Sequence, residues 1–182
     1  KNYYSGLGSN TRAAYNTQIA VAKGIILDYY VCQDRNDYYT FIPFLEAFSK
    51  YYHFFPKRVC ADAGYGTTDN YQFLFDNQIE NYVKFTDWQQ ETEGRKISLF
   101  IINSDLSLTC LNNKDALPMT TLDNRNVRRR QNSFYKIEDC LYCRHKKICA
   151  YNLKHPIKDH RVFETNPKLF HFKKEARANL LS

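Results

Sequence analysis

The stretch that decides the fold is Arg58-Val59-Cys60-Ala61-Asp62-Ala63-Gly64-Tyr65-Gly66. A short β-prone apolar run ends in one carboxylate, and two glycines then mark a turn. A strand end is a rigid mount for a catalytic or metal-binding carboxylate, and glycines allow a backbone or ligand to approach closely. The pattern predicts a strand over 58–61 and a candidate site at Asp62. An Asp that caps the next helix would produce the same pattern, so the spacing leaves both interpretations open.

The flanking segments predict a mixed α/β fold. The expected elements are a β-hairpin over 14–22 and 25–32, a helix over 41–52, a helix over 67–77 and a strand over 80–85. Lys23-Gly24 reads as the hairpin turn, and the apolar residues over 41–48 recur at helical spacing. Thr67 or Thr68 is the expected cap of the second helix. Antiparallel pairing followed by strand–helix alternation is typical of a mixed sheet rather than a purely parallel one.

With these elements in place, the chain resembles the DDE-type transposases of bacterial insertion sequences, and members with a cysteine-bearing insertion are most similar. The resemblance runs from about Tyr15 to the end of the chain. Its motifs are Tyr15-Asn16-Thr17-Gln18-Ile19-Ala20, Asp37 with Pro43-Phe44-Leu45-Glu46, and Ala61-Asp62-Ala63-Gly64-Tyr65 with Asp69-Asn70. Each motif is short, and their common order makes the set specific.

The resemblance implies an incomplete RNase-H-like mixed sheet with flanking helices, plus a small zinc-ribbon-like β insertion. It implies a partial catalytic core over 1–88, a cysteine-containing insertion over 89–170 and the start of the returning core helix over 171–182. Of the family's three catalytic acids, the first is expected upstream of Lys1 and the third after Ser182. Glu175 is the only acid in the terminal helix, but it lacks the Tyr and Arg that precede the family's glutamate.

The implied activity is metal-dependent DNA strand cleavage and transfer at insertion-sequence ends. Two Mg²⁺ (or Mn²⁺) ions stabilise the attacking and leaving oxygens in such a displacement at phosphorus, and carboxylates hold them. Asp62 matches the second acid and is therefore the expected catalytic residue and Mg²⁺ ligand. With one acid of three, residues 1–182 alone are expected not to cut DNA.

This interpretation also assigns expected roles to the polar residues around Asp62. Tyr65 is expected to contact DNA phosphate or to pack under Asp62. Asn16 and Gln18 share a strand face beside the expected active site, where one could support the first acid or satisfy the sheet edge. Asp34 and Asp37 are expected to end a strand and cap the following helix; the alternative is that they approach the catalytic metal ions.

The charge of the chain favours an anionic partner. The 182 residues carry a formal net charge of +7, and the pI is about 9.0, which is typical of many nucleic-acid-binding proteins. Four arginines within six residues suit phosphate contact, although a solvated loop is an equally simple explanation: Arg125, Arg128, Arg129 and Arg130. The resemblance implies double-stranded DNA, as transposon ends and target, and a homo-oligomer of the full-length protein.

No apolar run approaches the roughly 20 residues of a membrane span, and the amino terminus lacks a signal-peptide pattern. A soluble, intracellular protein without a membrane partner is therefore expected. The resemblance places it in the bacterial cytoplasm, associated with the nucleoid.

The six cysteines of the chain favour metal binding or free thiols over disulfides in a reducing compartment. Cys140 and Cys143 are separated by two residues, a spacing that directs two thiolates at one tetrahedral ion, and Cys149 follows as a third. Cys110 is the best fourth ligand because related transposases carry a cysteine near that position. A structural zinc ion is thus predicted.

Other interpretations of the cysteines remain open. His145, His155 and His160 compete with Cys110 for the fourth place, and all the thiols could instead be reduced members of a small core. Cys32 and Cys60 lie within predicted strands and are expected to be core residues.

Two other functions compete with the transposase interpretation. One is a catalytically dead zinc-containing DNA- or protein-binding module derived from a transposase. The other is a different two-metal nuclease or phosphatase with the same strand-end Asp.

Overall fold

The computed structural model describes residues 2–5, 11–93, 100–119, 133–150, 157 and 159–182. The chain divides into two compact units. Unit 1 comprises Lys1–Gln89 and Glu175–Ser182, and unit 2 comprises Gln90–Lys174. Among the helices of the described residues, none is long and apolar enough to span a membrane.

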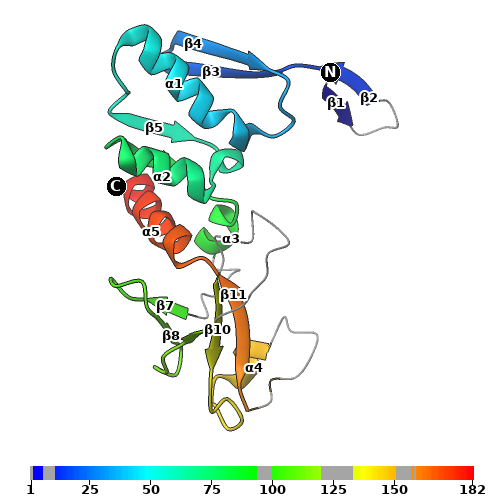
Figure 1. The fold of residues 1–182 in the computed structure, drawn as a ribbon, viewed down its shortest axis with the longest axis vertical. Helices are drawn as coiled ribbons and strands as arrows, with labels where there is room; N and C mark the ends of the chain where they lie inside the picture. The colour runs from blue at the N-terminus through cyan, green and yellow to red at the C-terminus, as the bar shows by residue number, and fades with distance from the viewer. Residues whose placement is uncertain (1, 6–10, 94–99, 120–132, 151–156, 158) are drawn as a thin grey trace. The chain divides into compact units, whose positions relative to one another are not determined.

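Unit 1 begins with two β-hairpins (Figure 1). The first joins β1 (Asn2–Ser5) to β2 (Thr11–Ala14), and the second joins β3 (Asn16–Ala22) to β4 (Ile25–Cys32). Lys23 and Gly24 connect β3 to β4 with φ values of 51° and 78°. Both residues are left-handed, as a two-residue turn that matches the strand twist requires. The predicted hairpin is confirmed.

Helix α1 (Phe41–Tyr52) follows a short 3₁₀ turn, η1 (Asp37–Tyr39). Phe41, Leu45 and Phe48 are buried on one face of α1, which confirms the helical spacing seen in the sequence. The helix packs on β4, where the Phe44 ring stacks on Tyr30 with centroids 6.1 Å apart.

The decisive stretch forms β5 (Arg58–Ala61), the 3₁₀ turn η2 (Ala63–Tyr65) and α2 (Thr68–Asp76), which leads into β6 (Glu80–Val83). β5 and β6 pair in parallel, whereas β3 and β4 pair antiparallel. The mixed α/β class is therefore confirmed. Helix α2 packs on β6, and Tyr71, Leu74, Val83 and Phe85 are almost fully buried.

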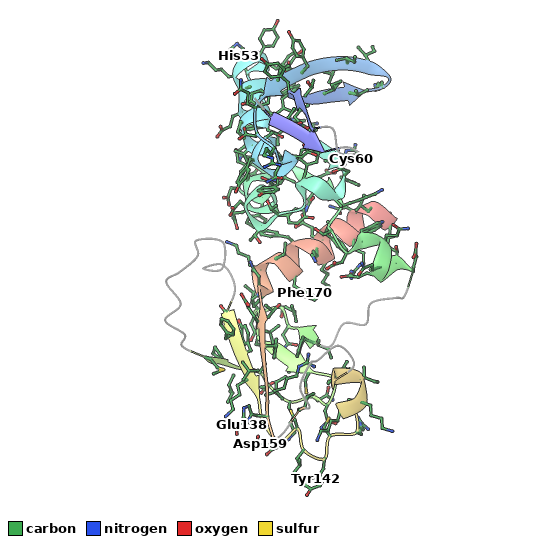
Figure 2. All side chains as sticks on the ribbon, turned by 90° about the vertical axis from the view of Figure 1, so that its right-hand side faces the viewer. His53, Cys60, Glu138, Tyr142, Asp159 and Phe170 are labelled. Carbon is green, nitrogen blue, oxygen red and sulfur yellow. The ribbon has the colours of Figure 1, made fainter. Side chains whose placement is uncertain are left out.

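The strands β3 and β5 leave a gap in unit 1. Within the described residues β3 pairs only with β4, and β5 pairs only with β6. A cavity of about 350 Å³ is lined by both strands and by the apolar face of α1. Cys60, labelled in Figure 2, lines this cavity and is exposed. The prediction that Cys60 is a core residue is wrong, because no strand of the described residues pairs with the edge of β5 opposite β6.

Unit 2 is built from small antiparallel sheets. β7 (Phe100–Ile102) and β8 (Leu108–Cys110) form an antiparallel hairpin. β9 (Leu117–Met119), β10 (Ser133–Ile137) and β11 (Arg161–Thr165) form a sheet in the order β11-β10-β9. The short helices are α3 (Trp88–Thr92), which begins in unit 1, and α4 (Lys146–Ala150). α5 (Pro167–Leu181) begins in unit 2 and ends in unit 1.

The core of unit 2 combines aliphatic residues with one cysteine. Leu108, Cys110, Ala116 and Ile137 are buried together, and partly buried aromatic rings pack against them. The rings of Phe100 and Phe163 stack with centroids 3.8 Å apart. Beyond the ends of β10 and β11 lie Glu138 and Asp159 (Figure 2).

Candidate functional site

Asp62 lies directly after β5 and is exposed. Its Oδ1 accepts a hydrogen bond of 2.8 Å from the backbone N–H of Gly64, and so this oxygen caps η2. Its other oxygen, Oδ2, accepts no hydrogen bond within the described part of the chain. The carboxylate therefore caps the short turn η2 and not helix α2, whose cap is Thr67.

A second carboxylate, that of Asp37, lies close to Asp62 on the other side of Gly64. A Cβ built on Gly64 would lie 3.0 Å from Asp62 Oδ1 and 3.5 Å from Asp37 Oδ2. Glycine at this position leaves room for both carboxylates. Residues 25 apart in the sequence thus place two carboxylates at one end of β5.

Two amide side chains of β3 hold Asp37 in place. Asn16 Nδ2 donates to Asp37 Oδ1 over 2.9 Å, and Gln18 Nε2 donates to the same oxygen over 3.4 Å and to Asn16 Oδ1 over 2.8 Å. Asp37 does not cap α1, whose N-cap position is Thr40 without a side-chain cap. The predicted capping role is therefore wrong, because Asp37 belongs to η1 and its carboxylate turns toward β3.

Tyr65 is half-buried in the turn after Asp62. Its ring packs against Phe41 with centroids 5.5 Å apart. Burial, and after it the nearby carboxylates of Asp37 and Asp62, together raise the pKa of Tyr65 to about 12. The phenol is therefore a neutral hydrogen-bond donor at physiological pH.

The turn is tied to the rest of unit 1 by two residues whose structural roles the sequence did not reveal. Asn70, on α2 and 1% exposed, donates from Nδ2 to the carbonyls of Tyr65 (2.8 Å) and Tyr38 (3.1 Å). At Gly66 a Cβ would lie 2.5 Å from the Lys84 carbonyl oxygen. The only sequence signal for these roles was the Asp69-Asn70 pair and the glycines flanking the turn.

The predicted DNA-binding arginines lie outside the described residues: Arg125, Arg128, Arg129 and Arg130. Tyr65 is therefore the predicted DNA-contacting residue that the structure does describe.

The four predicted zinc ligands come together in unit 2. Cys110, Cys140, Cys143 and Cys149 all line one small cavity. Burial raises the pKa of the Cys140 thiol, and the thiols of Cys143, Cys110 and Cys149 raise it further, which reflects their proximity. Within the described ranges, however, no group of three or more His, Cys, Asp or Glu side chains is placed so that it could hold a metal ion.

Comparison with known proteins identifies the family of this chain. A family model described as "Transposase DDE domain" matches residues 3–180. Searches of curated proteins and of solved structures find no match. The match covers nearly the whole chain and includes every motif on which the resemblance rests. The chain therefore belongs to the transposase DDE domain family.

Proposed function

We propose that this chain is part of a transposase that cleaves and transfers DNA strands at insertion-sequence ends, with Asp62 as a catalytic metal ligand. Proteins of this family act in transposition, bind DNA and in general use divalent metal ions. The observation that carries the proposal is the Asp62 carboxylate, which β5 and the Gly64 N–H hold rigidly while Oδ2 stays without a hydrogen bond in the described residues.

The donor set at this end of β5 suits Mg²⁺ or Mn²⁺. These ions take hard oxygen ligands, and Asp62 offers a carboxylate oxygen that the turn does not use. When bound, the ions activate a water or 3′-hydroxyl and stabilise the leaving oxygen. Asp62 would hold them, and the hydrogen bond from Gly64 would keep the carboxylate in one orientation.

Tyr65 is proposed to contact the DNA backbone. Because its pKa is about 12, the hydroxyl keeps its proton and donates to a phosphate oxygen without charge repulsion. The four arginines from Arg125 to Arg130 are proposed to add phosphate contacts from unit 2.

The gap in unit 1 supports an incomplete RNase-H-like sheet. The unpaired edges of β3 and β5 line one cavity above the apolar face of α1. Apolar side chains of the β3–β4 hairpin are also widely exposed: Ile19, Val21, Ile25, Ile26, Tyr29 and Val31. We propose that residues 1–182 alone do not cut DNA, because Asp62 matches one of the family's three catalytic acids and two-metal cleavage needs several carboxylates.

The proposed domain organisation assigns residues 1–88 to the partial catalytic core, 89–170 to the insertion and 171–182 to the returning helix. The insertion is proposed to be zinc-ribbon-like, with a structural zinc ion that takes no part in phosphoryl transfer. The full-length protein is proposed to act as a homo-oligomer on DNA at the bacterial nucleoid.

Cleavage of element-end DNA by the full-length protein in Mg²⁺ or Mn²⁺ tests the proposal. The isosteric variant Asp62→Asn should lose cleavage by at least ~100-fold while folding and DNA binding are retained. Asp76→Asn, at the far end of α2 in the same unit, is the matched control and should cut normally. Cleavage by Asp62→Asn at the control rate would overturn the assignment, and binding without cleavage by the unmodified protein would favour a binding module.

A further inference from the structure

The four cysteines of unit 2 come from three separate segments and line one cavity. Cys110 ends β8, Cys140 and Cys143 lie between β10 and α4, and Cys149 is on α4. Cys110 lies 30 residues before Cys140 in the sequence, and so the fold rather than local spacing brings the thiols together. Cys32 and Cys60 belong to unit 1, whereas the other four cysteines line the same cavity in unit 2.

The size and the lining of this cavity suit a single soft metal ion. Its volume is about 20 Å³, which is room for one water-sized particle and not for an organic ligand. Apart from the thiols it is lined by Phe100, Ile137, Ile157 and the cations Lys146 and Arg161. Without a carboxylate in the lining, the cavity does not suit Mg²⁺ or Ca²⁺, whereas four thiolates are a common ligand set of structural zinc.

The backbone around Cys110 also favours a thiolate. The N–H of Asn112 donates to Cys110 Sγ over 3.4 Å, and the N–H of Asn113 donates to the Cys110 carbonyl over 2.9 Å. An N–H group that points at sulfur stabilises the negative charge that a metal ligand must carry. Asn113 reaches this tight turn with a positive φ of 55°.

Arg161 lines the same cavity, and part of its guanidinium group is buried there. Its Nε and Nη1 atoms are buried and find no hydrogen-bond partner among the described residues, and its guanidinium lies 5.4 Å from the centroid of the Phe100 ring. Removing guanidinium nitrogens from water is unfavourable unless an anion or hydrogen-bond acceptors compensate the charge. The other cation of the lining, Lys146, donates to the Leu141 carbonyl over 3.1 Å.

We infer that unit 2 binds one Zn²⁺ through the thiolates of Cys110, Cys140, Cys143 and Cys149, and that Arg161 is the buried counter-charge of this site. Four thiolates around Zn²⁺ leave a net charge of −2, which supplies the anion that the Arg161 guanidinium lacks among the described residues. Each thiol releases its proton to solvent as the metal binds. The inference rests on the structural zinc ion of the proposed function and on the ligand set predicted from the sequence, and it adds the counter-ion.

The competing ligands have other partners. His145 Nε2 accepts a hydrogen bond from Arg144 Nε over 3.0 Å, and His160 Nδ1 lies 2.8 Å from Asp159 Oδ1. Neither histidine lines the cavity, and His155 lies outside the described residues. The structure thus favours the all-cysteine version over a site that contains one of these two histidines.

Zinc content of the full chain, purified under reducing conditions and titrated with Zn²⁺ against a chromophoric chelator, tests the ligand set. We expect one Zn²⁺ per chain, retained by Cys32→Ser, His145→Ala and His160→Ala and lost in Cys143→Ser. Because a serine variant can fail to fold, the absorption spectrum of the unmodified chain with Co²⁺ in place of Zn²⁺ provides a second measurement. We expect a sulfur-to-metal charge-transfer band with the intensity that four thiolate ligands produce. An unmodified chain that binds no metal, or a Co²⁺ spectrum with histidine ligation, would overturn the ligand set.

The counter-charge is tested by Arg161→Met and Arg161→Lys, with Arg144→Met as the matched control on an exposed arginine. Arg161→Met should weaken Zn²⁺ binding by about 10- to 100-fold, the usual effect of losing a group that supports metal ligands. Arg161→Lys and Arg144→Met should stay near the unmodified affinity. If Arg161→Met binds Zn²⁺ as tightly as the unmodified chain, the counter-charge is wrong and the zinc site stands. Neither assay depends on DNA cleavage.

Discussion

One oxygen of Asp62 stabilises the turn after β5, and the other is available for chemistry. The sequence could not separate a capping Asp from a catalytic one, because both follow a strand and precede a helix. In the structure Oδ1 accepts the capping hydrogen bond, and the metal-binding role that we propose for Asp62 falls to Oδ2. Gly64 makes this arrangement possible by leaving room between Asp62 and Asp37.

The two glycines of the turn should differ in their tolerance of alanine. At Gly66 a Cβ would lie 2.5 Å from the Lys84 carbonyl oxygen and 2.9 Å from Phe85 Cα, and backbone cannot move aside easily. At Gly64 the nearest atom, 3.0 Å away, belongs to the Asp62 side chain. We expect Gly66→Ala to lower the free energy of unfolding by ~1–3 kcal/mol and Gly64→Ala by less, as measured by urea denaturation. Equal losses would contradict the packing at Gly66.

Tyr65 should titrate late. Because burial, Asp37 and Asp62 together raise its pKa to about 12, the stability that its neutral phenol contributes is complete below pH 10. It should be lost as pH rises from 10 toward 12. Asp37→Asn removes a neighbouring negative charge and should lower the pKa of Tyr65, as followed by NMR of ¹³C-labelled tyrosine rings. Tyr71, whose pKa is raised by burial alone, is the internal control, and a Tyr65 titration unmoved by Asp37→Asn would refute the proximity of that carboxylate.

At the scale of elements, helix α2 both follows the turn η2 beside Asp62 and anchors it. Thr67 accepts a hydrogen bond from the Asn70 N–H over 3.3 Å and caps the helix, as the sequence predicted. The Asn70 side chain then binds the carbonyls of Tyr38 and Tyr65. The two 3₁₀ turns that carry Asp37 and Tyr65 are therefore joined through one buried amide.

Asn70→Ala should loosen this connection. It removes one donor from each of the Tyr38 and Tyr65 carbonyls, although the Tyr65 carbonyl keeps the hydrogen bond from the Thr67 N–H. We therefore expect the free energy of unfolding to fall by ~1–3 kcal/mol. Asp76→Asn, at the exposed end of the same helix, should stay within ~0.5 kcal/mol of the unmodified chain. Thermal unfolding followed by circular dichroism measures both, and an Asn70→Ala protein as stable as Asp76→Asn would show that these bonds contribute nothing.

The sequence predicted the elements that have local signals. The turn at Lys23-Gly24, the spacing of Phe41 and Phe48 and the threonine cap of α2 each lie within a few residues of the element they define. The role of Asp37 could not be predicted, because its partner Asn16 lies 21 residues away, on strand β3. The roles of Asn70 and Gly66 could not be predicted for the same reason, since only the folded chain brings their neighbours close.

At the scale of the whole molecule, two kinds of candidate metal ligand lie in two different units. Unit 1 places hard carboxylate oxygens at the end of β5, and unit 2 gathers soft thiols in a small apolar cavity. The sequence predicted the four cysteines from their spacing and from the resemblance, but not Arg161, which is 12 residues from the nearest of them. A cation is recognised as a counter-charge only once its buried surroundings are seen.

Metal removal should therefore act on one unit. A chelator that removes the proposed Zn²⁺ should speed amide hydrogen exchange in β8, β10 and α4, because the ion holds these segments together. Exchange in β5 and β6 of unit 1 should not change. Identical exchange of unit 2 with and without the chelator would contradict a structural role for the metal.

The central claim is that Asp62 itself ligates the catalytic ion, and a metal-specificity switch tests it most directly. In the full-length protein, Asp62→Cys replaces a hard oxygen ligand by a softer sulfur, which Mg²⁺ accepts poorly and Mn²⁺ tolerates better. The measurement is the ratio of element-end cleavage rates in Mn²⁺ and Mg²⁺. The account predicts that this ratio rises at least ~10-fold above that of the unmodified protein. A ratio equal to the unmodified protein's, or full cleavage by Asp62→Cys in Mg²⁺, would contradict it.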